Sequence, residues 1–330
     1  MRVLFDHPSP FLLAHGGFQI QIEQTRQALG GLGVQVEWLR WWDDAERGDI
    51  IHFFGRPTHW YIRAAQQKGM KVVFSELLTG LGSRSRLERT GQAAAIRLLR
   101  RRSLFDRMSW DAFRFADVAV ALTSWEAHLM RTVFGAPAEK VQIIPNGVEA
   151  EFFDAPPAVR GPWLVCTATI TERKRVCELC EAAVLAKTPL WIVGKPYSEG
   201  DAYYTRFEQV RRSAPDLIRF EGEIADRAAL ATIYREARGF VLLSTMESLS
   251  LSALEAAATE CPLLLSDLPW ARTTFGPGAA YCPISSPHSV AAVLRRFYDE
   301  APTRQRPPKP RTWLEIADEL RVLYARLLRS

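Results

Sequence analysis

The chain has 330 residues, 48% of them hydrophobic, which is enough to fill two sizeable cores and makes two domains the natural expectation. The formal net charge is only +5, and five cysteines form an odd, clustered set that is unlike a disulfide framework. No apolar run approaches the ~18 residues of a membrane-spanning helix, and Asp6 comes too early for a signal peptide. Composition therefore favours the reducing cytoplasm.

The first half of the chain alternates between short apolar strands and helical stretches. Strands are predicted at residues 2–5, 34–39, 49–55, 71–74 and 116–122, and helices at 17–31, 60–67 and 125–134. This alternation is typical of a doubly wound parallel sheet. Gly16 and Gly17 stand at the start of the first helix, where backbone amides without a screening side chain could approach a phosphate group. A plain turn is the alternative interpretation.

Residues 83–107 carry most of the excess charge. Eight arginines stand there against Glu88 and Asp106, a local balance of +6 that exceeds the +5 of the whole chain. Apolar residues are interleaved, so one interpretation is a basic amphipathic helix, Arg84 to Arg107, that lies on an anionic membrane surface. A solvated arginine face on an ordinary helix is the alternative. Nucleic acid is not expected as a partner, because no recognised nucleic-acid module accompanies the patch.

The first domain is predicted to span residues 1–155. It closes with IIPNGVE at 143–149, where Asn146 and Gly147 suit a left-handed turn. The Pro-rich residues 155–162 read as a linker, and the second domain then spans 156–310. Residues 311–330 carry apolar side chains at helical spacing and predict a terminal helix.

The second half repeats the alternation of strands and helices. Strands are predicted at 163–168, 190–193, 218–220, 239–243 and 262–265, and helices at 176–187, 228–238 and 289–298. Cys177 and Cys180 form a C-x-x-C pair. With no second cysteine pair and no histidine beside them, packing thiols are favoured over a zinc or redox site.

Two glutamates frame a turn between two of these strands. Glu247 stands where the chain leaves the strand at 239–243, and Glu255 lies about two helical turns further on. The amides between them would open a helix and attract phosphate oxygens; they belong to Ser248, Leu249, Ser250 and Leu251. Two carboxylates around an amide-lined turn suit a sugar nucleotide, which has hydroxyl groups at both ends and a diphosphate between. A surface turn residue and a solvated helix residue are the alternative.

The segment ESLSLSALEA, residues 247–256, resembles the E-x7-E element of the family-4 retaining glycosyltransferases. IIPNGVE is similar to the family's signature at the interdomain turn, and the C-terminal WLEIADELRVLYARLL resembles the helix that crosses back onto the first domain. The resemblance implies the GT-B fold: an α/β protein with two Rossmann-like, doubly wound domains facing a central cleft. The first domain would serve the acceptor and the second the nucleotide-sugar donor.

The resemblance also implies roles for residues of the second domain. Glu247 would contact the hydroxyl groups of the donor sugar, and Glu255 would hold the ribose. Lys174 matches the basic residue that neutralises the donor diphosphate, with Arg173 beside it. Gly222 and Ile224 would belong to the loop whose backbone recognises the base.

In the first domain, Gly16 and Gly17 match a glycine-rich loop beside the donor phosphates. Many family members place a histidine after the fourth strand, whereas this chain has Ser75-Glu76 there. Glu76 and His15 are the candidates on the acceptor side, each with an equally good interpretation as a satisfied loop residue. Thr169 and Ser250 are further departures from the family pattern.

The expected function is transfer of a hexose-type sugar, with retained configuration, from a nucleotide-sugar to a glycan, lipid-linked or small-molecule acceptor. No D-x-D triplet occurs in the chain, so neither a metal nor another cofactor is expected. Two alternatives remain open: a nucleotide-sugar-binding, membrane-docking protein with little transfer activity, and a sugar-nucleotide epimerase of the same fold. The expected location is the cytoplasm, with peripheral attachment to the inner face of the membrane as a further hypothesis.

Overall fold

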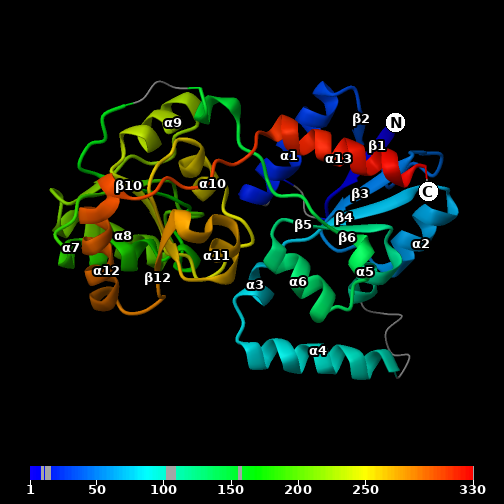
Figure 1. Ribbon diagram of the computed structural model, residues 1–330, viewed down its shortest axis with the longest axis horizontal. Helices are drawn as coiled ribbons and strands as arrows, with labels where there is room; N and C mark the ends of the chain where they lie inside the picture. Colours follow the sequence, from blue (N-terminus) through cyan, green and yellow to red (C-terminus); the bar gives the residue numbers. More distant parts are fainter. Residues whose placement is uncertain (9–10, 12–15, 102–108, 155–157, 330) are drawn as a thin grey trace. The chain divides into compact units, whose positions relative to one another are not determined.

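The computed structural model describes residues 1–8, 11, 16–101, 109–154 and 158–329 (Figure 1). The chain forms two compact units: Met1–Gly147 together with Arg311–Ser330, and Val148–Pro310. Each unit contains one six-stranded sheet in which every strand pair is parallel. The predicted α/β class with two doubly wound domains is confirmed.

The sheet of the first unit has the order β2-β1-β3-β4-β5-β6. Its strands are β1 (Arg2–Asp6), β2 (Gln35–Trp38), β3 (Ile50–Phe54), β4 (Lys71–Ser75), β5 (Val118–Ala121) and β6 (Val141–Ile143). Every residue of β3 and β5 is buried, as expected of inner strands that helices cover on both faces. The edge strand β6 has only three residues, too short a run for the sequence pattern to predict.

Helices cover both faces of this sheet, over two separate apolar clusters. They are α1 (Gly17–Gly31), α2 (His59–Gln67), α3 (Thr79–Gly82), α4 (Arg86–Arg101), α5 (Ala112–Phe115), α6 (Ser124–Thr132) and α13 (Trp313–Leu327), with short 3-10 turns η1 (Ser109–Asp111) and η2 (Ala138–Lys140). The hydroxyl groups of Thr58, Thr123 and Thr312 cap three of these helices. The arginine-rich segment is helical over α4; its residues 102–107 lie outside the described residues.

The C-terminal helix α13 packs beside α1 in the first unit (Figure 1). The hydroxyl group of its buried Tyr324 forms a hydrogen bond with His52 of β3, with 2.6 Å between the hydroxyl oxygen and Nδ1. Gly147 does not adopt the left-handed conformation predicted for it. A side chain is excluded for another reason: a Cβ there would lie 2.5 Å from the Cα of Trp313.

The sheet of the second unit has the order β12-β11-β10-β7-β8-β9. Its strands are β7 (Leu164–Thr167), β8 (Leu190–Val193), β9 (Ile218–Phe220), β10 (Gly239–Leu242), β11 (Leu263–Ser266) and β12 (Ala279–Cys282). The helices and 3-10 turns are η3 (Ala150–Phe152), η4 (Glu172–Lys174), α7 (Val176–Leu185), α8 (Ala202–Ser213), α9 (Arg227–Glu236), α10 (Leu251–Ala258), α11 (Pro269–Phe275), η5 (Gly276–Gly278), α12 (Pro287–Glu300) and η6 (Ala301–Thr303).

Two helices and one strand of this unit lie outside the sequence prediction: α8, α11 and β12. The strand β12 reads AAYC, whose small residues give no strand signal. The second unit also begins at Val148 and not at 156. Val148 and Phe152 are buried, and the Phe152 ring lies 6.0 Å from that of Tyr234, so these residues pack with the second unit.

The five cysteines are free and buried, which agrees with their interpretation as packing thiols. Burial raises the pKa of the Cys166 thiol to about 12. None of the described helices combines the length and the apolar character needed to cross a bilayer.

Candidate functional site

The predicted strand–turn–helix–strand around the two glutamates is present, running from β10 through α10 to β11. The turn begins after Leu242, and α10 starts at Leu251. Ser250 is the N-cap, and its hydroxyl accepts from the amide of Ala253 at 3.3 Å. Its φ of −76° is open to any residue. The hydroxyl of Ser250 is thus used within the protein, whereas the amides of Leu251 and Ser252 open the helix without an intrahelical acceptor.

Glu247 lies against the two predicted cations. The Lys174 ammonium is 2.5 Å from Glu247 Oε1, and Arg173 Nη1 is 3.1 Å from the same oxygen. Arg173 Nη1 also donates to the carbonyl of Met246 at 3.0 Å. The Lys174 and Glu247 side chains are about nine-tenths buried, and that of Arg173 is 38% exposed. Two cations share one carboxylate, so this cluster of Arg173, Lys174 and Glu247 carries one net positive charge.

The loop that presents the cations is held in an unusual conformation. Residues 172–174 form η4, and Arg175 then takes a left-handed φ of 54° before α7 begins. A non-glycine residue in this region stores strain of about 1–2 kcal/mol. The loop is fastened to the glutamate turn, because the amide of Thr245 donates to the carbonyl of Arg173 at 2.8 Å. Cations and carboxylate are therefore positioned by paired backbone segments.

Three buried hydroxyl groups in and next to these two loops have no hydrogen-bond partner in the described part of the chain. They belong to Thr171, Ser244 and Ser248. Thr171 precedes η4, Ser244 follows β10, and Ser248 follows Glu247. Buried hydroxyl groups are normally satisfied. Their concentration beside two cations indicates a place where a ligand with acceptor oxygens would complete the hydrogen bonding.

Glu255 is buried more deeply, on the second turn of α10, and faces other partners. Its carboxylate pairs with the guanidinium of Arg227 and accepts from the Tyr234 hydroxyl at 3.0 Å. Arg227 Nε lies 3.0 Å from Glu149 Oε1. Burial raises the pKa of Glu255, and Arg227 opposes this. No sequence motif predicts this network. The one hint is an arginine as the first residue of α9, where the helix dipole disfavours a cation.

The predicted base loop follows β9. Gly222 has a left-handed φ of 74°, and its carbonyl accepts from the amide of Gly194 at 2.7 Å. Gly194 follows β8 and leaves no room for a side chain, since a Cβ there would meet the carbonyl oxygen of Ala168. Ile224 is half-buried. The loops after β7, β8 and β9 are therefore in contact at one edge of the sheet.

The predicted residues of the first unit that the structure describes stand at the start of α1 and after β4. Gly16 is the N-cap of α1 with a φ of 150°, and Gly17 is the first helical residue; His15 lies outside the described residues. Glu76 follows β4 and is held by Arg56 through two hydrogen bonds of 2.6 and 2.5 Å. The Arg56 guanidinium lies over the rings of Phe113 and Phe134. This clamp favours a structural role for Glu76 over a role as a free base.

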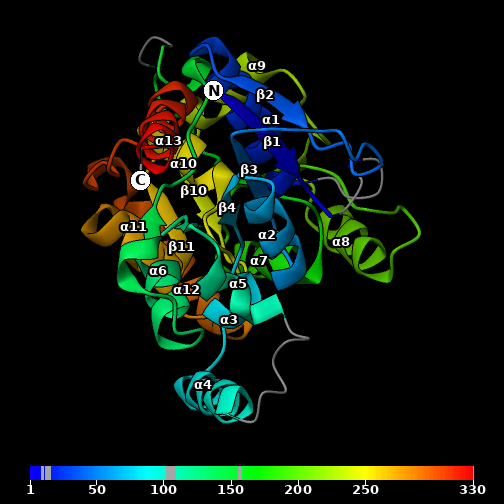
Figure 2. The same cartoon turned by 90° about the vertical axis from the view of Figure 1, so that its right-hand side faces the viewer.

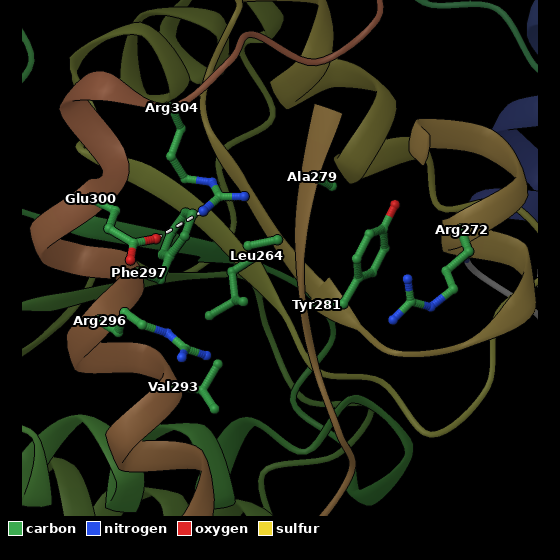
Figure 3. A pocket seen from close by; sticks show the side chains of 10 residues that line it. Leu264, Arg272, Ala279, Tyr281, Val293, Arg296, Phe297, Glu300 and Arg304 are labelled. Carbon is green, nitrogen blue, oxygen red and sulfur yellow. Dashed lines mark hydrogen bonds and ion pairs between the residues drawn. The ribbon is translucent and has the colours of Figure 1, made fainter. Parts of the chain in front are cut away.

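A cavity of about 380 Å³ lies elsewhere in the second unit, beside the edge strand β12 and α12 (Figure 3). Its lining residues do not include the glutamates or cations described above. Two of its arginines are neutralised within the protein: Arg304 by Glu300 at 2.9 Å, and Arg272 by Asp267. The cavity is separate from the cluster around Glu247.

The fold has close counterparts among solved structures. The sucrose-phosphate synthase of Thermosynechococcus elongatus superposes with a TM-score of 0.72 and 18% identity, covering 99% of each chain. Anabaena HepE, solved in complex with UDP, superposes with a TM-score of 0.70 and 14% identity, covering 99% of this chain and 100% of HepE. In sequence, residues 16–152 match the profile of Glycosyltransferase Family 4, and residues 161–300 match that of Glycosyl transferases group 1. The chain belongs to the family-4 glycosyltransferases with the GT-B fold.

This glycosyltransferase also has a relative in Kineococcus radiotolerans. The D-inositol 3-phosphate glycosyltransferase of that organism is 28% identical over 221 residues, covering 57% of this chain and 51% of the relative. The match therefore spans about half the length of that relative. The predicted family is confirmed by these similarities.

Proposed function

We propose that this glycosyltransferase moves a hexose-type sugar from a nucleotide-sugar donor to a glycan, lipid-linked or small-molecule acceptor, with retained configuration and without a metal. The observation that carries the proposal is the cluster of Lys174, Arg173 and Glu247. An excess positive charge beside unsatisfied hydroxyl groups and helix-opening amides suits a diphosphate. Glu247 then orients the hydroxyl groups of the sugar, and Glu255 accepts from the ribose.

The reaction breaks the bond between the anomeric carbon and the phosphate oxygen and forms a bond from the same carbon to the acceptor oxygen. In front-face attack, the departing phosphate oxygen takes the proton of the acceptor hydroxyl. Negative charge develops on the diphosphate, and Lys174 and Arg173 stabilise it. Because the phosphate accepts the proton, neither Glu76 nor His15 is needed as the base.

A donor panel tests this function. Purified protein is incubated with UDP-, GDP- and ADP-sugars, with and without a pool of acceptors, and the released nucleoside diphosphate is measured. The proposal expects release from one donor class that depends on acceptor, survives EDTA, and gives an α-linked product from an α-linked donor. A β-linked product or loss of activity in EDTA would refute the corresponding part of the proposal.

The same panel separates the two alternatives. A nucleotide-sugar-binding protein would bind a donor in calorimetry without releasing nucleotide. An epimerase would convert the donor, or release nucleotide, without any acceptor. A site for the donor diphosphate is expected in all three cases, so the dependence on acceptor is the deciding measurement.

The proposal includes an anionic membrane surface as a partner of α4 (Figure 2). Ala93 and Ile96 turn one face of this helix into the unit. On the opposite face Leu87 is 85% exposed and Leu98 is 54% exposed. The two leucines lie on one exposed stripe of the helix together with Gly91 and Ala94. The four residues follow the i, i+4, i+7 and i+11 spacing of a single helix face.

Exposed Arg86 and Arg97 lie along one side of this apolar stripe. An arginine near an anionic surface contributes about 1 kcal/mol, and the leucines would enter the interface between headgroups and acyl chains. The two leucines on the face turned away from the core add apolar area beside these arginines. Charge and apolar area thus support one partner, an anionic lipid surface that would bring a lipid-linked acceptor near.

Vesicle flotation tests the membrane partner. Wild type is expected to float with phosphatidylcholine vesicles that contain phosphatidylglycerol and not with phosphatidylcholine alone. Leu87→Gln with Leu98→Gln, and separately Arg86→Glu with Arg97→Glu, should abolish flotation. The matched control changes two exposed apolar residues of α13, Leu314→Gln and Val322→Gln, and should float as wild type. No flotation of wild type on either vesicle would refute this partner.

A further inference from the structure

The buried network around Glu255 contains a cation that no recognised motif assigns. Arg227 contacts two carboxylates at once: Nη2 pairs with Glu255, and Nε lies 3.0 Å from Glu149 Oε1. Its guanidinium carbon is 4.8 Å from the centre of the Phe152 ring. The side chain is 31% exposed, whereas those of its carboxylate partners are 7% and 13% exposed. These three contacts restrict the guanidinium to one conformation. The guanidinium in turn restricts the orientation of the two carboxylates.

The network leaves Glu255 with free acceptor capacity. A carboxylate accepts about four hydrogen bonds, two at each oxygen. Arg227 occupies one position on Oε1, and the Tyr234 hydroxyl occupies one on Oε2. One position on each oxygen remains, which matches the two neighbouring hydroxyl groups of a ribose. The carboxylate can hold a ribose in this way only while it is ionised, because protonation converts one oxygen into a donor.

Ionisation of Glu255 depends on Arg227. The carboxylate is buried, and burial raises its pKa; nearby Glu149 raises it further, while Arg227 and the Tyr234 hydroxyl lower it. These are the charged or titratable groups that face it from α9 and from the beginning of the second unit. Arg227 is the one cation among them. Removing it would leave two carboxylates close together in a buried site.

We propose that Arg227 is a positioning residue for the donor: it keeps Glu255 ionised and oriented for the ribose and fastens it to Glu149. This inference rests on the proposed function, since it concerns the ribose of the donor. Glu149 stands two residues after Gly147, where the chain leaves the first unit. Arg227 therefore joins the ribose carboxylate to the segment that enters the second unit.

The ligand-free protein gives the first test, the pH dependence of the unfolding free energy. In Arg227→Met the pKa of Glu255 rises further above its value in the unfolded chain. A raised carboxyl pKa means that stability is retained at acid pH and lost as pH rises through the folded-state pKa. The stability gap between wild type and Arg227→Met should therefore widen from pH 5 to pH 8. A gap that stays constant with pH would overturn the inference, since loss of packing alone behaves in that way.

The second test is nucleotide binding. UDP, GDP and ADP are titrated into wild type by calorimetry, and the tightest binder is then used with the variants. Arg227→Met should weaken it about tenfold at pH 7, the loss of one charge-assisted hydrogen bond, and this loss should shrink as pH rises and Glu255 ionises. Arg227→Lys, which keeps the charge, should recover part of the affinity. Unchanged affinity in Arg227→Met would overturn the proposal.

Two further proteins complete the design. Glu149→Gln keeps Arg227 beside Glu255 and removes a carboxylate that raises the pKa of Glu255. Its stability gap from wild type should therefore narrow from pH 5 to pH 8, opposite to Arg227→Met, and this tests the coupling even if Arg227→Met folds poorly. Arg295→Met removes an exposed arginine that pairs with Asp299 and lies over Tyr298, and should change neither readout. Failure of wild type to bind any of the three nucleotides would refute the proposed function; the stability test judges the coupling of Arg227 to Glu255 in either event.

Discussion

Lys174 and Glu247 meet at a single carboxylate oxygen, with 2.5 Å between the ammonium nitrogen and Oε1. They are 73 residues apart in sequence and come from the loops that follow β7 and β10. The contact is nine-tenths buried, so water screens it little. The carboxylate therefore holds in place the cation that we assign to the departing diphosphate.

Lys174→Met and Glu247→Gln should each lower kcat/KM by about ten- to a hundredfold or more, because each removes a charged contact made in the transition state. The double variant should lose less than the product of the two, since both changes break one pair. Initial rates with the active donor and circular dichroism of the fold are the measurements. Arg212→Met, at an exposed ion pair of α8, is the control. Wild-type rates in both single variants would contradict the assignment.

Glu76→Gln should reduce stability and leave the chemistry largely intact. The change breaks the clamp on Arg56, whose side chain is 14% exposed, and a lost charge-assisted contact costs about 1.5–3 kcal/mol. Urea unfolding gives the stability, and the pH profile of kcat gives the chemistry. Loss of the acid limb of that profile with unchanged stability would instead identify Glu76 as a base.

His52 should make the first unit sensitive to acid. Burial lowers the pKa of its imidazole to about 3, while the unfolded chain has the ordinary value of about 6.5. Stability is therefore fully present above pH 6.5 and is lost as pH falls toward the folded-state pKa, by up to about 1.4 kcal/mol per pH unit. His52→Gln should flatten this dependence between pH 6.5 and 4.5, measured by urea unfolding. His288→Gln, at an exposed position, should keep the slope of wild type.

Gly147→Ala should destabilise the packing of α13. The new methyl group would lie 2.5 Å from both the Cα and the nitrogen of Trp313, and overpacking of this kind costs about 1–3 kcal/mol or more. Chemical unfolding followed by tryptophan fluorescence measures the loss. Gly30→Ala is the matched control, because a Cβ at Gly30 meets no atom within 4 Å; it should gain up to ~1 kcal/mol. Equal stability of the two variants would show that α13 moves to accommodate the methyl group without a loss in the free energy of unfolding.

Local patterns in the sequence determined the architecture and the main site motif. Buried parallel strands are continuous apolar runs, and helices repeat every 3.6 residues, so both can be recognised without knowledge of their neighbours. Glu247 and Lys174 stand at strand ends, which meet at one edge of a parallel sheet. Their approach therefore follows from the order of strands and helices along the chain.

Other features depend on contacts between distant segments, and only the tertiary structure decided them. The proposed positioning role of Arg227 depends on Glu149 and Glu255, which flank it. The three residues come from different elements, so no residue spacing within one element predicts their contact. The two apolar faces of α4 look alike in sequence until one is seen to be buried. Gly147 excludes a side chain because Trp313, far along the chain, occupies the space. Sequence periodicity shows which residues of one segment share an apolar face. Tertiary packing decides which partner covers that face and which group fills the last free position on a carboxylate.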